Sequence, residues 1–284
     1  INSFNNDIYP MEVDKSRVVK DNRFKCDTNS RRVFNSNKKG MSRKPKDARA
    51  ARSAEGRHEV SGDLTVMYTN ADSLLNKRDE LHALIGIHKP SIIGIVEVKP
   101  KNLRYDVQEC EIGLKGYHTF HNLNSSGRGV SLHVAEALRP TEVEVDSGLK
   151  EGVCCDCALE DGTLRVCVIY RSPNSAQENN DLILEEISKI SSSSPSHKLI
   201  MGDFNYPKID WVGNSGEGGG PQARQFKIAC DDAFLIQHIA EPTRVRQGQE
   251  PSLVDLILTN RDDMVMDTQI LPGLGKSDHS VVVC

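Results

Sequence analysis

Short apolar runs alternate with polar, turn-rich segments from Asp63 to the end of the chain, and most runs have the length of a strand. Residues 64–70 (LTVMYTN), 163–170 (TLRVCVIY) and 198–201 (KLIM) predict strands. Residues 91–96 (SIIGIV) are continuously apolar, which predicts a strand buried on both faces. Further strands are predicted at residues 113–120, 129–135, 152–160, 252–259 and 280–283. The pattern thus indicates a protein rich in short strands.

Three segments have the apolar spacing of helices. Ser73 is a candidate N-cap for a helix that runs to about His88, and Pro90 stops it. Residues 181–190 predict a short amphipathic helix, and residues 222–238 predict another after a glycine-rich loop. We find no internal repeat.

Polar and ionisable residues gather where the predicted strands end. Asp203 and Asn205 follow the strand KLIM within MGDFNYP, although Asp and Asn are depleted in strands and frequent in turns. Other strands end in the same way, at Asn70, Glu97 and Tyr170, or are flanked or interrupted by Asp278, His279 and Asp255. Loops at one rim of a sheet core are where sites are usually built, so this recurrence indicates a functional site.

Each of these residues also has a structural interpretation when it is taken alone. Asn70 could cap a helix, and Glu97 could be a surface acid. Tyr170 could be an aromatic residue at a strand end, and Asp255 could pair locally, although an acid between apolar neighbours needs a partner. Histidines without such company are interpreted as structural; they are His118, His121, His133 and His238.

The chemistry of the set favours a hard cation. Carboxylate and amide oxygens, without clustered thiolates or histidines, suit Mg²⁺, with Mn²⁺ as a substitute. Mg²⁺ needs only one or two carboxylates beside a substrate phosphate, so a sparse set of ligands is enough. Such an ion, helped by a His and a Tyr, would stabilise the charge that develops when a phosphodiester is hydrolysed.

Charge divides the chain into two parts. Residues 1–60 carry a balance of +7, whereas the remainder carries −11, within a net charge of −4. We therefore predict a basic, disordered leader at 1–61 and a folded domain at 62–284. The leader is a solvated arm, a localisation signal or a nucleic-acid contact. No stretch approaches the length of a membrane span, so no membrane partner is expected.

The eight cysteines follow no disulfide framework. Cys154, Cys155 and Cys157 lack the spaced partners of a zinc site and fit a half-buried strand that carries reduced thiols. A reducing, intracellular compartment is therefore expected.

Several motifs resemble one known family. TNADSLLNKRDEL, IIGIVE, YRSPN, MGDFNYPKIDW, EPTR, SLVDLILTN and GKSDHS occur in that order over residues 62–284. They resemble the endonuclease/exonuclease/phosphatase superfamily and, more narrowly, the apurinic-type endonuclease domain of non-LTR retrotransposons of the jockey and chicken-repeat kind. GDFN and SDH match the whole superfamily, whereas GDFNYPKIDW and EPTR are more specific to the retrotransposon branch.

The resemblance implies roles for the residues at matching positions. The implied metal ligands are Glu97, Asn70 and Asp278. The implied catalytic residues are Asp203 and Asn205 at the attacking water, His279 oriented by Asp255 at the phosphate, and Tyr170 at the phosphate or leaving group. The implied substrate contacts are Arg171, Asn174 and Arg128.

Two departures from the family pattern lie beside this site. The family acid is usually followed by Thr, whereas Val98 and Lys99 follow Glu97. The family's Arg-Gly-Gly-Val stretch appears as residues 128–130, one glycine short. Both departures bear on substrate preference or efficiency more than on the metal centre.

The resemblance implies a four-layered α/β sandwich for residues 62–284, with two mixed sheets packed face to face and helices outside. It implies an Mg²⁺-dependent endonuclease that nicks double-stranded DNA to leave 3′-hydroxyl and 5′-phosphate ends, as in target-primed retrotransposition. The protein would be made in the cytoplasm and act in the nucleus, with element RNA or a separate or downstream reverse transcriptase as an implied partner. Alternatives are an apurinic-site repair endonuclease, another phosphoesterase of this fold, and a catalytically dead, domesticated binding protein.

Overall fold

A computed structural model describes residues 63–103, 105–123, 127–145, 148–211 and 219–284. The chain divides into two units, residues 1–51 and 52–284. The predicted basic leader at 1–61 and its boundary lie outside the described residues, as does most of the predicted glycine-rich loop. Within the described ranges, no helix has both the length and the apolar character needed to cross a bilayer.

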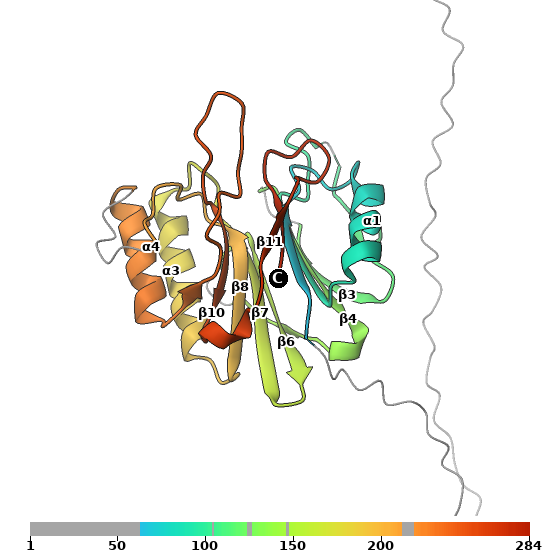
Figure 1. Ribbon diagram of the computed structural model, residues 1–284, viewed down its shortest axis with the longest axis horizontal. Coiled ribbons are helices and arrows are strands. Elements are labelled where there is room, and N and C mark those ends of the chain that lie inside the picture. The colour runs from blue at the N-terminus through green and yellow to red at the C-terminus, as the bar shows by residue number, and fades with distance from the viewer. Residues whose placement is uncertain (1–62, 104, 124–126, 146–147, 212–218) are drawn as a thin grey trace, which may run out of the picture. The chain divides into compact units, whose positions relative to one another are not determined.

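Two six-stranded sheets form the centre of the domain (Figure 1). The first sheet has the order β11 (Gln269–Leu271), β12 (Val281–Val283), β1 (Val66–Asn70), β2 (Ile92–Val96), β4 (Val130–Ala135) and β3 (Tyr117–Asn122). The second sheet has the order β5 (Thr141–Val143), β6 (Gly152–Leu159), β7 (Gly162–Tyr170), β8 (His197–Asp203), β10 (Asp255–Thr259) and β9 (Ile236–Gln237). Each sheet holds one parallel pair, β1 with β2 and β7 with β8, among antiparallel pairs, so both sheets are mixed.

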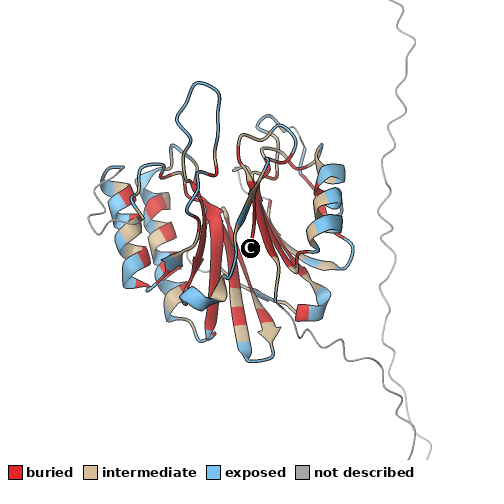
Figure 2. Cartoon of the chain, in the orientation of Figure 1, coloured by how far each residue is buried: buried red, intermediate tan, exposed pale blue. Residues whose placement is uncertain are grey.

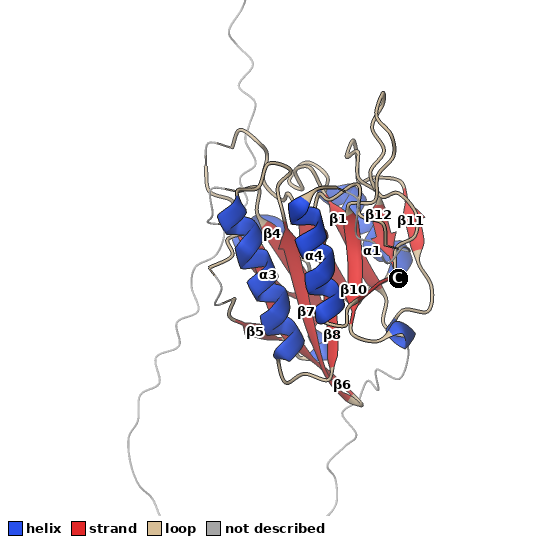
Figure 3. Cartoon of the chain, turned by 90° about the vertical axis from the view of Figure 1, so that its left-hand side faces the viewer, coloured by secondary structure: helices blue, strands red, loops and turns tan. Residues whose placement is uncertain are grey.

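Helices cover the outer faces of both sheets. The α-helices are α1 (Arg78–His88), α2 (Glu109–Ile112), α3 (Gln177–Ser192) and α4 (Pro221–Asp232), and two 3₁₀ turns are η1 (Glu136–Leu138) and η2 (Asp262–Met264). Helices α3 and α4 lie side by side on the second sheet, and α1 covers the first (Figures 1 and 3). The predicted four-layered α/β sandwich is confirmed.

Alternation along the strands builds three buried layers. In β2, Ile92 and Val96 face the second sheet, whereas Ile93 and Ile95 face the layer under α1. The inner layer joins both sheets, and a third layer lies under α3 and α4. The central strands are buried and the outward sides of the helices are exposed (Figure 2). The prediction that β2 is buried on both faces is therefore confirmed.

Two predicted helix boundaries are wrong. Ser73 does not cap α1, because its φ is +78° and its N–H donates to Glu97 O at 2.8 Å; the helix begins at Arg78 instead. The helix predicted to reach residue 238 ends at Asp232. There Phe234 takes the left-handed φ of +52°, and the chain turns into β9.

The expectation of reduced thiols is wrong for two cysteines. Cys154 of β6 and Cys167 of β7 are directly opposite each other and form a disulfide with a Cα–Cα distance of 4.2 Å. Because cross-strand partners meet only after the strands pair, the spacing of these cysteines in the sequence gives little sign of the bond. Cys155 and Cys157 are buried free thiols whose sulfur atoms lie 3.8 Å apart.

Candidate active site

The strand pairing brings the predicted polar strand ends to one rim of the sandwich. Asn70 ends β1, and Glu97 directly follows the parallel strand β2. In the second sheet, Tyr170, Asp203 and Asp255 are neighbours in register across β7, β8 and β10. Their side chains therefore share the inner face, opposite Asn70 of the first sheet.

Several residues at this rim have a left-handed backbone. Glu97 and Asn205 have φ of +52° and +51°, and Asp72 and Ser73 have φ of +37° and +78°. A non-glycine residue in this region costs about 1–3 kcal/mol and persists only where the surrounding structure holds it. Such strain accompanies functional sites, and here it aims two of the predicted site residues.

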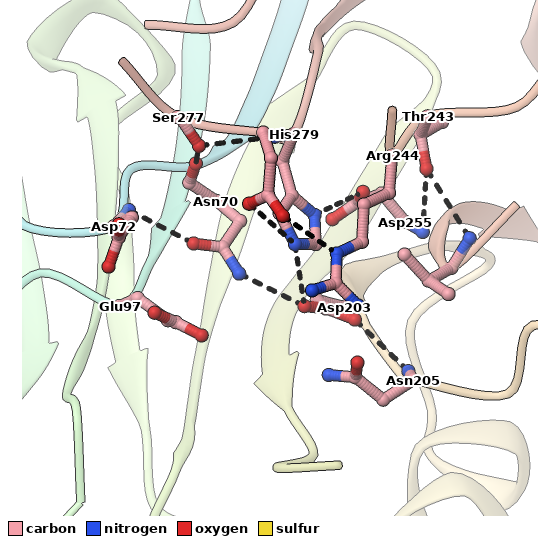
Figure 4. Close-up of polar contacts among 12 residues, drawn as sticks. Asn70, Asp72, Glu97, Asp203, Asn205, Thr243, Arg244, Asp255, Ser277 and His279 are labelled. Carbon is pink, nitrogen blue, oxygen red and sulfur yellow. Dashed lines mark hydrogen bonds and ion pairs between the residues drawn. The ribbon is translucent and has the colours of Figure 1, made fainter. Parts of the chain in front are cut away.

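Asp203 is a buried carboxylate at the centre of the group (Figure 4). Asn70 Nδ2 donates to its Oδ2 at 3.0 Å, and the N–H of Asn205 donates to its Oδ1 at 3.0 Å. The side-chain amide of Asn205 donates to Arg171 O at 2.8 Å, which fixes the turn after β8. His279 Nε2 lies 3.8 Å from Asp203 Oδ2.

Asp255 orients the imidazole of His279. Its Oδ2 lies 2.8 Å from His279 Nδ1, and its Oδ1 accepts a hydrogen bond from the buried Tyr68 hydroxyl at 3.1 Å. The N–H of Asp255 donates to Thr243 Oγ1 at 3.0 Å. The arrangement leaves Nε2 of His279 directed toward Asp203 and Asp278.

Burial and charge shift the pKa of both central groups. Burial, reinforced by the charge of Asp255, raises the pKa of Asp203 to about 8. Burial alone would lower the pKa of His279, but the charges of Asp255, Asp203 and Asp278 outweigh it and raise this pKa to about 9. Asp203 therefore changes its protonation state just above neutral pH in the metal-free protein, while His279 carries a proton at neutral pH.

Glu97 is held by two donors. The Tyr170 hydroxyl donates to Glu97 Oε1 at 2.7 Å, and Arg128 Nη1 lies 2.6 Å from Oε2. Arg128 Nη2 also donates to Asp72 Oδ1 at 2.8 Å. Burial and the charge of Glu97 raise the pKa of Tyr170 well above its ordinary value, so its hydroxyl is a neutral donor.

Asp278 approaches the group from the last loop. Its Oδ1 lies 3.9 Å from His279 Nε2, and its Oδ2 accepts a hydrogen bond from Arg244 Nε at 3.1 Å. Ser277 Oγ donates to Asn70 O at 2.7 Å and ties this loop to β1. The charges of two predicted metal ligands reach the central pair of residues. The charge of Glu97 contributes to the raised pKa of Asp203, and the charge of Asp278 contributes to that of His279.

The predicted substrate contacts occupy different environments. Arg171 is only 6% exposed; its Nε donates to Asn180 and its Nη1 to the carbonyls of residues 204 and 205. The guanidinium holds the turn that carries Asn205, and the phosphate contact of Arg171 stays a prediction. Asn174 is exposed in the loop after β7. Arg128 lies at the site, bonded to Glu97 and Asp72.

The oxygen donors at the rim fit a hard divalent cation. Glu97, Asn70 and Asp278 offer carboxylate and amide oxygens around Asp203, as Mg²⁺ prefers. Ligand atoms of Asp203, Asp255 and His279 also lie within 4.8 Å of one another. We interpret that trio as a hydrogen-bonded network, because Asp255 is already bonded to His279 Nδ1 and to Tyr68.

Sequence reasoning missed several residues of the site. Tyr68 lies two positions before Asn70, and residues i and i+2 of a strand share a face, so alternation was an available signal. Thr243 and Arg244 belong to the EPTR motif, which was recognised without a role for either residue. Asp72 gave no signal, because its place depends on the turn after β1.

Comparisons with known proteins agree with this fold. A family described as endonuclease-reverse transcriptase matches residues 164–283. No curated protein sequence matches the chain. The endonuclease domain of TRAS1, a telomere-specific non-LTR retrotransposon, has a TM-score of 0.59 at 17% identity over 78% of this chain and 96% of its own.

Two other similar structures come from microbial proteins. An AP endonuclease from Archaeoglobus fulgidus has a TM-score of 0.59 at 17% identity, over 78% of this chain and 98% of its own. The 3′ phosphatase NExo from Neisseria, bound to a product DNA hairpin, has a TM-score of 0.54 at 14% identity, over 78% and 98%. The fold is that of the endonuclease/exonuclease/phosphatase superfamily. These matches support the motif resemblance to the endonuclease/exonuclease/phosphatase superfamily.

Proposed function

We propose that this protein is an Mg²⁺-dependent endonuclease that nicks DNA and leaves 3′-hydroxyl and 5′-phosphate ends. The observation that carries the proposal is the network in which a protonated His279, oriented by Asp255, faces the proposed base Asp203. Glu97 and Asn70 border the same network with the oxygen donors that an Mg²⁺ ion requires.

The bound cation would neutralise charge on the phosphate and on the leaving oxygen. Asp203 would orient a water and accept its proton as the water oxygen attacks phosphorus. Asn205 would keep that carboxylate in place through its N–H. The low exposure of Asp203 excludes bulk water, which strengthens each of these interactions.

His279 would stabilise the phosphate through Nε2–H while Nδ1–H stays bonded to Asp255. As the bond from phosphorus to the 3′-oxygen breaks, that oxygen would take up a proton from solvent and leave as a 3′-hydroxyl. Tyr170 lies beside Glu97 with a neutral hydroxyl and is placed to assist at the phosphate or leaving group. Arg171 acts indirectly, because it holds the turn of Asn205.

The substrate we propose is double-stranded DNA. The TRAS1 domain is described as an endonuclease of a telomere-specific retrotransposon, and NExo binds a product DNA hairpin. Since residues 61–284 carry −11, the basic residues 1–60 are a source of the positive charge that phosphates require. Action in the nucleus, with element RNA or a reverse transcriptase as partner, follows from the retrotransposon resemblance and is part of the proposal.

The decisive experiment is relaxation of supercoiled plasmid by the full chain. We expect nicking with Mg²⁺ or Mn²⁺ and none with EDTA, and ends that a polymerase extends directly. Failure to nick with either metal, by protein that is folded by circular dichroism, would refute the proposal. Intact and abasic duplexes assayed side by side distinguish an element-type nickase from an apurinic-site repair enzyme.

A further inference from the structure

All three side-chain nitrogens of Arg128 are bonded within the site. Nη1 lies 2.6 Å from Glu97 Oε2, Nη2 donates to Asp72 Oδ1 at 2.8 Å, and Nε donates to Lys99 O at 2.8 Å. The side chain is 16% exposed, so the guanidinium is largely buried at the edge of the centre. The carboxylate it contacts is the one proposed as the main metal ligand.

The loop that carries Arg128 is fixed by a second acid. Glu151 Oε1 accepts the N–H groups of Arg128 and Gly129 at 2.7 and 3.2 Å. The N–H of Lys99 donates to Arg128 O at 2.7 Å, which ties the loop to the segment after β2. Hydrogen bonds to both the N–H and the carbonyl of Arg128 therefore fix the backbone from which its side chain reaches Glu97.

We infer that Arg128 competes with the divalent cation for Glu97 and thereby makes metal binding dependent on a DNA phosphate. A guanidinium and a metal ion on one carboxylate repel each other, because both are positive. A phosphodiester that reaches the rim offers the guanidinium another bidentate anion. Transfer of Arg128 from Glu97 to the phosphate frees the carboxylate oxygen for the ion. This inference rests on the proposed function.

The alternative role, in which Arg128 only orients Glu97, predicts that removing Arg128 weakens metal binding instead of strengthening it. Loss of a residue that orients a metal ligand weakens metal binding by about 10–100-fold. Glu97 has other supports, however, since Tyr170 holds Oε1 at 2.7 Å and the N–H of Ser73 holds its carbonyl at 2.8 Å. Removing Arg128 should therefore remove repulsion and leave the ligand in place.

The test is Mn²⁺ binding by the full chain, measured by calorimetry without DNA. We expect Arg128→Ala to bind Mn²⁺ about tenfold more tightly than wild type. Lys101→Ala is the matched control: it removes the same charge near Asp72, at 3.9 Å, but from a side chain 73% exposed. Its affinity should stay near that of wild type. Unchanged or weaker binding by Arg128→Ala would overturn the inference.

The same titration with a short phosphorothioate duplex tests the coupling. The gain in Mn²⁺ affinity on adding duplex should be about tenfold larger for wild type than for Arg128→Ala. Equal gains would contradict the coupling. If Arg128→Ala does not fold, Arg128→Gln removes the charge but keeps most of the side chain, and it should bind Mn²⁺ more tightly than wild type, with a smaller duplex gain.

Glu97→Gln separates failure of this inference from failure of the proposed function. If Glu97→Gln binds Mn²⁺ as wild type does, the metal centre itself is misassigned. If Glu97→Gln loses binding while Arg128→Ala resembles wild type, the metal centre stands and only the competition by Arg128 is wrong.

Discussion

Asp255 Oδ2 and His279 Nδ1 lie 2.8 Å apart, although the two residues come from different sheets of the sandwich. Asp255 begins β10, and His279 precedes β12. The bond therefore spans the gap between the sheets at the rim. It sets both the orientation and the charge of the imidazole.

Replacing Asp255 with Asn should reduce nicking about 10²–10⁴-fold. Without this carboxylate, the pKa of His279 falls from about 9 toward its ordinary value of 6.5, so the proton is lost at pH 8 but largely kept at pH 6. The deficit should thus be greater at pH 8, as a pH–rate profile would reveal. Tyr68→Phe, which spares the Asp255 charge, is the control. A deficit independent of pH would indicate orientation alone.

Replacing Asp203 with Asn should abolish nicking yet stabilise the metal-free protein at high pH. The raised pKa of Asp203, about 8, means that its contribution to stability is full below 3.8 and is lost as the pH rises through 8. Asn stays neutral throughout. Melting temperatures in EDTA should be higher for the variant than for wild type at pH 9, and the two should converge at low pH. A variant less stable at pH 9 would contradict this.

His133 should make the protein sensitive to acid. Burial lowers its pKa to about 3, and its ring nitrogens lie 3.0 and 3.1 Å from the hydroxyls of Thr119 and Ser131. Below pH 6.5 the unfolded chain binds a proton that the folded protein rejects, so stability falls by about 2 kcal/mol between pH 6.5 and pH 5. Urea unfolding should show a shallower loss for His133→Gln. His82→Gln, at an exposed position, should retain the wild-type slope.

Gly202→Ala should prevent stable folding. A Cβ at this position would lie 2.0 Å from Ile169 O in the neighbouring strand, and backbone cannot move aside cheaply. We expect a loss of more than about 3 kcal/mol, visible as low soluble yield or a depressed melting temperature. Gly86→Ala in α1 meets nothing within 4 Å and should be neutral or stabilising by up to about 1 kcal/mol. Equal stability of the two variants would be inconsistent with this packing.

Deleting residues 1–61 should weaken the salt dependence of DNA binding. Each Lys or Arg that contacts a phosphate adds about 0.9 to the slope of log K against log salt. The slope should therefore fall with the number of leader contacts that are lost. Filter binding over a range of salt concentrations measures it, and an unchanged slope would exclude the leader as a DNA arm.

The pattern of apolar residues was enough to predict most strands, because buried strands impose a strict pattern of faces, whereas the sandwich was implied by the motif resemblance. The polar strand ends were also readable, since Asp203 and Glu97 interrupt runs that would otherwise be apolar. The sequence pattern did not predict the roles of residues whose positions depend on the conformation of a turn. Ser73 has the composition of a cap, but the left-handed turn after β1 uses its N–H to hold Glu97 O.

Contacts between distant segments account for the remaining differences. The Cys154–Cys167 disulfide depends on the register of β6 with β7. The burial of Arg171 depends on Asn180 of α3 and the turn after β8, which no local pattern brings together.

Tyr170, Asp203 and Asp255 form one row across three strands. Because neighbouring side chains on a strand point to opposite faces, a slip of β8 by a single residue would direct Asp203 beneath α3 and α4 and bring Gly202 or Phe204 into its place. The hydrophobic alternation that selects the correct pairing therefore also aligns the proposed catalytic acids. When the strands of the second sheet pair in the correct register during folding, the same step brings together this half of the proposed site.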